Sequence, residues 1–222
     1  YYYKTTDMEQ NLSKKTRTES DLIGSREVPE SALYGVQTLR GIENFRISKF
    51  HLNEYPLFIQ ALAITKMGAA VANRELDLLT EEQTDAILKA CKEILEGKHH
   101  DQFPVDMIQG GAGTTTNMNA NEVIANRALE LMGHARGEYH YCSPNDHVNR
   151  SQSTNDAYPT AIHIGLYYTH LKLVKHFATL IEAFRKKGAE FAHIIKMGRT
   201  QLEDAVPMTL GQTFNGFASI LE

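Results

Sequence analysis

The sequence predicts an all-α protein, and three observations support this fold class. Apolar residues recur at three- and four-residue spacing in several long segments, which is the period of an amphipathic helix. Segments with the two-residue alternation of strands are scarce, and only residues 51–54 and 138–142 leave short strands open as an alternative to loops. The strongest periodic segment, residues 157–195, is long enough for a helix of roughly 58 Å.

The first part of the chain is expected to be a tail followed by a helix. Residues 1–20 are rich in Lys and Thr and have no apolar period, so we expect a polar tail there. Helical periodicity begins at Glu30, directly after Pro29. The apolar residues that carry this period step by three and are Leu33, Val36, Leu39 and Ile42.

Three further helices are expected before the long one. Pro56 favours the first turn of a helix that ends near Leu76. The hydroxyl of Thr80 can cap the start of a third helix, which ends near Gly97. A fourth helix is expected over residues 117–133, with alanine and larger apolar residues on one face.

The long periodic segment carries apolar residues on two sides, which favours a multi-helix bundle shared between subunits over one curved helix on a local core. Residues 209–222 also have a helical pattern, and no capping Gly or Asn follows, which indicates a fragment. We therefore expect a polar tail (residues 1–20), an N-terminal helical domain (21–152) and the truncated first part of a central helical bundle (153–222).

Composition excludes several classes of protein. The 222 residues are 42% hydrophobic and 23% charged, which is a globular balance. The net charge of −4 argues against a nucleic-acid-binding surface. The apolar stretch 61–72 is interrupted by Lys66, so we expect no membrane span, and the first twenty residues lack a secretory signal. Two cysteines provide no disulfide framework, and we expect a cytoplasmic protein.

Three polar segments stand out as candidate sites. The first, residues 109–122, is rich in glycine and hydroxyl residues and leads into a helix, which suits an anion. It lacks the lysine of a phosphate-binding loop and the spacing of a dinucleotide-binding fingerprint, so we expect no nucleotide cofactor. An elaborate helix cap and a carboxylate site remain equally good interpretations of this segment, in which Thr114 is a candidate ligand-binding residue.

The second segment, residues 143–160, lies at the start of the long helix, and the third segment, residues 197–212, follows its end. Ser153, Thr154 and Asn155 place two hydroxyls and an amide at a helix start, although one of the polar residues there can simply be a cap. Thr200 and Gln201 form a polar pair in the connection to the last helix. For this third segment, spacing alone favours a plain turn between two helices.

Other reactive side chains are weaker candidates. The ten histidines have no local set of Asp, Glu or Cys that resembles a closed metal site, so we expect no metal. Cys142 lies near the second segment, and packing is a better interpretation than nucleophilic catalysis.

The three segments together resemble the fumarase/aspartase superfamily over residues 21–222. The matching stretches begin Val28-Pro-Glu-Ser-Ala-Leu-Tyr-Gly, Gly111-Ala-Gly-Thr-Thr-Thr-Asn-Met-Asn, Ser151-Gln-Ser-Thr-Asn-Asp and Gly198-Arg-Thr-Gln-Leu-Glu-Asp. The resemblance implies a homotetramer with active sites built from three subunits. It also implies the reversible removal of ammonia from L-aspartate to give fumarate, through an enediolate intermediate.

The resemblance assigns a role to each candidate residue. Thr114, Ser153 and Thr154 would donate hydrogen bonds to the enediolate oxygens. Asn155 and Gln201 would face the amino group, and Thr200 would help to hold the substrate.

The catalytic base of this superfamily is a serine in the pattern G-S-S-x-M-P-x-K-x-N, which this sequence lacks. Ser25 stands in a partial imitation of the pattern, but Ser31 occupies the position of the lysine. We expect the serine beyond residue 222, and an isolated fragment without lyase activity.

Two alternatives remain. A class II fumarate hydratase usually has Ser-Ser-Asn and Thr-His where this chain has Ser153-Thr154-Asn155 and Thr200-Gln201. Both differences favour the amino-acid lyase. A non-catalytic scaffold protein of the same superfamily is the other alternative, because fold alone does not determine function.

Overall fold

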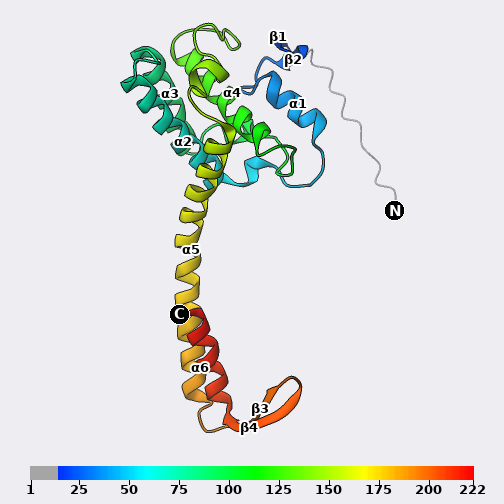
Figure 1. Cartoon of the computed structure of the whole chain (residues 1–222), viewed down its shortest axis with the longest axis vertical. Helices are drawn as coiled ribbons and strands as arrows, with labels where there is room; N and C mark the ends of the chain where they lie inside the picture. Colours follow the sequence, from blue (N-terminus) through cyan, green and yellow to red (C-terminus); the bar gives the residue numbers. More distant parts are fainter. Residues whose placement is uncertain (1–14) are drawn as a thin grey trace, which may run out of the picture. The chain divides into compact units, whose positions relative to one another are not determined.

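The computed structural model describes residues 15–222, and α-helices dominate them (Figure 1). Its strands form two separate two-stranded antiparallel sheets. The helical fold class is therefore confirmed, with two β-hairpins that the sequence did not predict. The chain separates into two compact units, one up to Gly165 and the other from Leu166 to Glu222. The expected boundary at residues 152/153 precedes this division, because the first turns of the long helix pack into the first unit through Ala157 and Ala161.

The first unit begins with a β-hairpin where a tail was expected. Strand β1 (Thr16–Asp21) pairs with β2 (Gly24–Pro29), so residues 16–20 are not part of a tail. The rest of the predicted tail, up to residue 14, lies outside the described residues. The hydroxyls of Thr16 and Thr18 both donate to the Glu27 carboxylate on the facing strand. Polar cross-strand pairs such as these stabilise a hairpin without any apolar period.

Helix α1 (Val36–Asn44) starts later than the predicted Glu30. Two buried carboxylates decide where it begins. Glu122 accepts from the backbone N–H groups of Gly35, Gln37 and Thr38, and Glu19 accepts from that of Val36. These are the amides at a helix start that have no partner within the helix. Since Glu122 is distant in the sequence, local periodicity could not locate this start.

The next three helices confirm the prediction closely. Helix α2 spans Pro56–Glu75 and α3 spans Glu81–Leu95. As expected, Thr80 caps α3: its Oγ1 accepts from the backbone N–H of Gln83, and the Gln83 side chain accepts from the Thr80 N–H. Helix α4 spans Thr114–Leu131 and starts three residues before the predicted Asn117. Three short helical turns complete this unit, at Leu52–Glu54 (η1), His100–Gln102 (η2) and Pro144–Val148 (η3, a π-helical turn).

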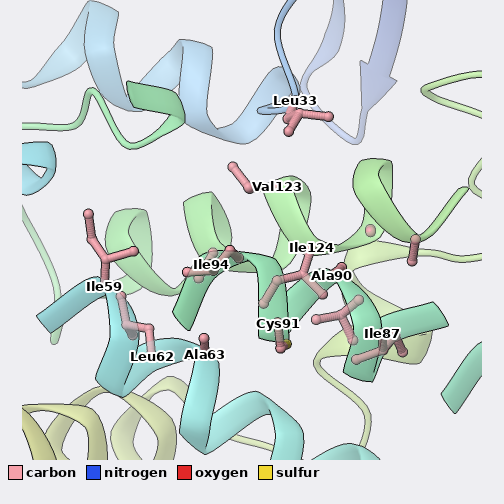
Figure 2. Close-up of a cluster of buried hydrophobic side chains, with 14 of the residues drawn as sticks. Leu33, Ile59, Leu62, Ala63, Ile87, Ala90, Cys91, Ile94, Val123 and Ile124 are labelled. Carbon is pink, nitrogen blue, oxygen red and sulfur yellow. The ribbon is translucent and has the colours of Figure 1, made fainter. Parts of the chain in front are cut away.

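These helices enclose one hydrophobic core. Helix α3 packs against both α2 and α4, and α4 also packs against α1. Figure 2 shows the resulting cluster, in which side chains from α2, α3 and α4 meet with Leu33, which precedes α1. Its fully or almost fully buried members include Ile59, Leu62, Ile87, Ile94 and Ile124. Burying one such side chain contributes about 1.5–3 kcal/mol, so this cluster is the main source of stability of the first unit.

The second unit contains the rest of helix α5 (Thr154–Glu190), strands β3 (Ile195–Thr200) and β4 (Glu203–Thr209), and helix α6 (Leu210–Leu221). Helix α5 ends before the predicted residue 195, because Ile195 already belongs to β3. The expected plain turn between two helices is a β-hairpin instead. Gln201 and Leu202 form its two-residue turn with φ of 49° and 70°, the left-handed pair that matches the twist of such hairpins.

Helices α5 and α6 pack closely within this unit. Gly188 O of α5 lies where a Cβ on Gly211 would be, so glycine allows the two backbones to approach. Rings of Phe184 and Phe191 contact that of Phe214 with centroids 5.6–6.1 Å apart. Ala218 is nevertheless the one buried apolar residue among the described residues of this unit.

Candidate active site

A cavity of about 550 Å³ lies where two of the three polar segments meet. Its lining includes Gly111, Ala112 and Gly113, which precede α4, and Asn155 and Tyr158 from the first turns of α5. Thr114, the first residue of α4, directly follows this lining, and Ser153 and Thr154 directly precede Asn155 at the start of α5. The fold therefore brings the starts of two helices to one cavity, and each helix start favours negative charge.

The start of α4 is capped by a side chain that leaves part of it open. Gln109 Oε1 accepts from the backbone N–H of Thr116 at 2.9 Å, and Gln109 Nε2 donates to the Thr116 hydroxyl at 2.8 Å. Within residues 15–222, the N–H groups of Thr114 and Thr115 and the hydroxyl of Thr114 have no hydrogen-bond partner. Because Gln109 supplies the cap, Thr114 is not needed for it, and the carboxylate-site interpretation of this segment gains support.

Gly113 is the residue that lets α5 close over this helix start. It is the N-cap of α4, with φ of 87°. A Cβ at Gly113 would also overlap the ring of Tyr158. No other residue type combines the left-handed conformation with the missing side chain, so glycine is required here.

The start of α5 is capped by Ser153. Its Oγ accepts from the backbone N–H of Asn155 at 3.1 Å, and Asp156 Oδ2 accepts from the Ser153 N–H at 3.3 Å. This confirms the expectation that one residue of the second segment caps the helix. The bond uses Ser153 Oγ as an acceptor, so its hydroxyl proton remains free to donate to a ligand. Asn155 is exposed and lines the cavity.

Thr154 is held by a buried network that the sequence did not predict. The Lys66 ammonium has 0% exposure and donates to Asn117 Oδ1 at 2.7 Å, to Asn149 Oδ1 at 2.9 Å and to Gln152 Oε1 at 2.9 Å. Asn117 Nδ2 in turn donates to Thr154 Oγ1 at 3.1 Å. Burial lowers the pKa of Lys66 to about 7. The available signal was the single charge in the apolar stretch 61–72, since a buried charge needs polar partners.

Thr200 and Gln201 lie in the second unit and are not part of the cavity lining. Thr200 ends β3, and Gln201 occupies the left-handed turn that follows. Both are exposed, and their side chains form no hydrogen bond with the described residues. Left-handed backbone at a residue other than glycine is uncommon and is found at functional turns.

The weaker candidates have structural surroundings. Cys142 is fully buried, and burial raises the pKa of its thiol to about 12, which suits packing and not nucleophilic chemistry. Ser25 lies in β2, where its Oγ is 2.7 Å from Ser20 Oγ. No group of three possible metal ligands occurs among residues 15–222. No helix in that range is both long enough and apolar enough to cross a bilayer.

Comparison with known protein families decides the classification. A family model described as a lyase matches residues 24–222. The chain belongs to this lyase family. The resemblance found in the sequence is therefore confirmed.

Relatives within the lyase family agree in name. The chain is 59% identical over 205 residues to aspartate ammonia-lyase from Pseudomonas fluorescens, a match that covers 92% of this chain and 43% of that protein. It is 55% identical over 212 residues to aspartate ammonia-lyase from Escherichia coli K12, covering 95% of this chain and 44% of that protein. The chain thus spans less than half the length of these relatives.

Solved structures in the same family share the fold. The native structure of a fumarate lyase:delta crystallin from Brucella melitensis matches with a TM-score of 0.85 and 53% identity, over 93% of this chain and 48% of that one. A class II fumarase from Schistosoma mansoni matches with a TM-score of 0.80 and 38% identity, over 93% of this chain and 43% of that one.

Proposed function

We propose that the protein carrying this chain is a carbon–nitrogen lyase that converts L-aspartate reversibly to fumarate and ammonia. The observation that carries the proposal is the meeting of two helix starts at one cavity, with free N–H groups on α4 and the Ser153-Thr154-Asn155 run on α5. This set consists of neutral donors and acceptors, which suits a dicarboxylate that must be bound and oriented. The aspartate ammonia-lyases at 55–59% identity support the choice of substrate.

In the proposed mechanism, a base removes a proton from the carbon beside the β-carboxylate of aspartate. The electron pair of the C–H bond moves into that carboxylate and forms an enediolate. It then returns to form the carbon–carbon double bond of fumarate, while the bond to the protonated amino group breaks and releases ammonia. Donors aimed at the enediolate oxygens lower the barrier because charge develops there. We assign this task to Thr114, Ser153 and Thr154.

The remaining residues bind the substrate. Asn155 and Gln201 face the amino group, and Thr200 helps to hold the substrate. The base is a serine supplied by sequence that the longer relatives have and that this chain does not span. The homotetramer and its three-subunit sites belong to the same proposal, and the exposed apolar side chains of α5 support them. A cytoplasmic location stays a prediction.

An assay of the reverse reaction tests the proposal. The full-length protein is supplied with fumarate, with and without ammonium, and the formation of aspartate and of malate is measured. We expect aspartate to form much faster than malate. Faster malate formation would instead identify a fumarate hydratase, which the likeness to the class II fumarase keeps as the second candidate. If neither product formed, the remaining alternative would be a non-catalytic scaffold protein.

A further inference from the structure

The buried Lys66 ammonium has an unusual set of partners. Its three N–H groups have three amide oxygens as acceptors, from Asn117, Asn149 and Gln152. None of its hydrogen-bond partners among the described residues is a carboxylate. Because every N–H of the ammonium is used, its orientation and that of the three amides are mutually determined.

Lys66 decides which way the Asn117 amide points. Asn117 Oδ1 accepts from Lys66, so its Nδ2 must point to the other side. There Nδ2 donates to Asn149 Oδ1 at 3.0 Å and to Thr154 Oγ1 at 3.1 Å. The reversed amide would place its N–H groups against the ammonium and its oxygen against Asn149 Oδ1. The observed orientation is therefore the only one that satisfies both ends of the amide.

Asn117 in turn decides how Thr154 can bond. A hydroxyl has one proton to donate and lone pairs to accept with. Because Asn117 Nδ2 occupies a lone pair of Thr154 Oγ1, the proton of Thr154 is directed elsewhere. Within residues 15–222 no group accepts it. Thr154 is partly exposed beside the cavity-lining Asn155, so this proton remains available to a ligand.

We infer that Lys66 is a positioning residue that acts through Asn117 to make the Thr154 hydroxyl a hydrogen-bond donor to a bound carboxylate. The inference rests on the proposed function for the identity of the ligand as a dicarboxylate. A simpler role for Lys66 is to fasten the loop of residues 149–152 to the core. That role predicts a loss of stability, but it does not predict a specific link between Lys66 and the donor role of Thr154.

The substitution Asn117→Asp separates the two roles. One carboxylate oxygen of Asp can still accept from Lys66, so the buried pair is kept. The other oxygen replaces the N–H that pointed at Asn149 Oδ1 and Thr154 Oγ1. It repels Asn149 Oδ1, which lowers the melting temperature, and it accepts the Thr154 proton. We expect the variant to stay folded while the inhibition constant of succinate, a non-reacting dicarboxylate, rises about 10- to 100-fold, as for the loss of one hydrogen bond to a charged group.

Asn73→Asp is the matched control. Asn73 is buried and its Nδ2 donates to the backbone carbonyl of Arg150, so it fastens the same loop without contacting Thr154. We expect this control to lower the melting temperature and to change succinate inhibition less than about twofold. If loop fastening alone mattered, both substitutions would weaken succinate binding alike.

A double-mutant cycle in the full-length protein completes the test. Asn117→Asp and Lys66→Met are each made alone and together with Thr154→Val, and the second of them keeps the test open if the first does not fold. We expect neither substitution to weaken succinate binding further once Thr154 is Val, because both act through the same hydroxyl. Losses that multiply, or single variants within twofold of the unmodified protein, would overturn the inference.

The outcomes for the two proposals can be told apart. Aspartate turnover by the unmodified protein, with equal succinate binding in all variants, overturns the positioning role and leaves the lyase function standing. A protein without aspartate turnover that still binds succinate, and loses it in Asn117→Asp, rejects the lyase and supports the positioning role. A protein that binds no succinate overturns both.

Discussion

The first unit buries the apolar faces of its helices within itself, whereas the second unit leaves most of its apolar side chains exposed. Leu62 on α2 is 1% exposed, but Leu166 and Leu173 on α5 are 60% and 46% exposed. Every member of the hydrophobic core belongs to the first unit, up to Ala161. Yet both units have helical apolar periodicity in the sequence.

Helical periodicity in a sequence therefore predicts an apolar stripe on a helix, but not whether that stripe is buried. An apolar stripe has to pack against another element, but its sequence does not determine which element that is. In the first unit α2, α3 and α4 cover one another, while in the second unit α5 has α6 as its packed helix. Contiguous exposed apolar surface of this kind marks an interaction surface. The comparison therefore supports the proposed bundle between subunits.

Charged side chains also differ in exposure between the two units. In the first unit Glu122 is 1% exposed and accepts four hydrogen bonds from α1 and its N-cap. Burial raises the pKa of Glu122 to about 7 despite these bonds. In the second unit the ion pairs Arg185–Glu222 and Arg199–Asp204 are largely exposed, and such pairs contribute little stability.

The largest expected effect concerns residues 1–222 taken alone. We expect this chain to release no ammonia from aspartate, since the proposed base is absent, and to self-associate through the exposed side chains of α5. Light scattering at several concentrations, with an ammonia-release assay, measures both properties. A stable monomer at all concentrations would contradict the conclusion that the exposed apolar side chains of the second unit form an interaction surface. Measurable turnover would show that the base lies within the chain.

The next effect concerns the site of the first unit. In the full-length protein, Thr114→Ala and Ser153→Ala should each reduce kcat/KM by about 10²- to 10³-fold, the usual result of losing one donor to a developing oxyanion. Circular dichroism should show an unchanged helical content. If both variants kept kcat/KM near that of the unmodified enzyme, these hydroxyls would be helix-start residues without a role in the reaction.

A matched pair of leucines tests the contrast in burial directly. Leu62→Ala should destabilise the chain by about 2–5 kcal/mol because it opens a cavity in the core. Leu173→Ala should cost less than about 0.5 kcal/mol in a dilute monomer, since that side chain is half exposed. Urea unfolding at low protein concentration measures both values. Equal losses would mean that α5 has a cover of its own in the monomer.

The smallest effect is a loss of stability of the first unit in acid. Hydrogen bonds from Arg127 hold the pKa of Glu93 at about 2. Burial opposes the charge of Asp106, but the N–H groups of Ile108 and Ser48 hold its pKa at about 2. Both values lie below the ordinary 4.5 and 3.8, so the unfolded chain binds protons first as the pH falls.

The stability that these carboxylates contribute should therefore be present above about pH 4.5 and be lost towards pH 2. Hydrogen exchange of peptides from α3 measures this loss within the first unit. The control Glu93→Gln should show a shallower dependence on pH between those limits. Exchange rates in α3 that stay constant from pH 5 to pH 3, after correction for intrinsic exchange, would contradict the prediction.

Local sequence alone determined the helices whose signals lie within one or two turns. Pro56 starts α2, and the Thr80–Gln83 capping pair starts α3, as predicted. The polar runs that contain Thr114 and Ser153 also identified the family, because those motifs are continuous in the chain. Such features depend only on neighbouring residues, so the local sequence is sufficient to predict them.

Tertiary structure alone decided the features that depend on distant partners. Helix α1 starts where Glu122 and Glu19 reach its N–H groups, and not where its apolar period begins. The β3–β4 hairpin depends on pairing across a two-residue turn that helical periodicity does not reveal. Lys66 interrupts an apolar stretch in the sequence, but its three amide acceptors come from α4 and the loop before α5. A buried charge or an unpaired backbone N–H forms hydrogen bonds with the groups that the fold brings near it. These partners are neighbours in space and not in the sequence.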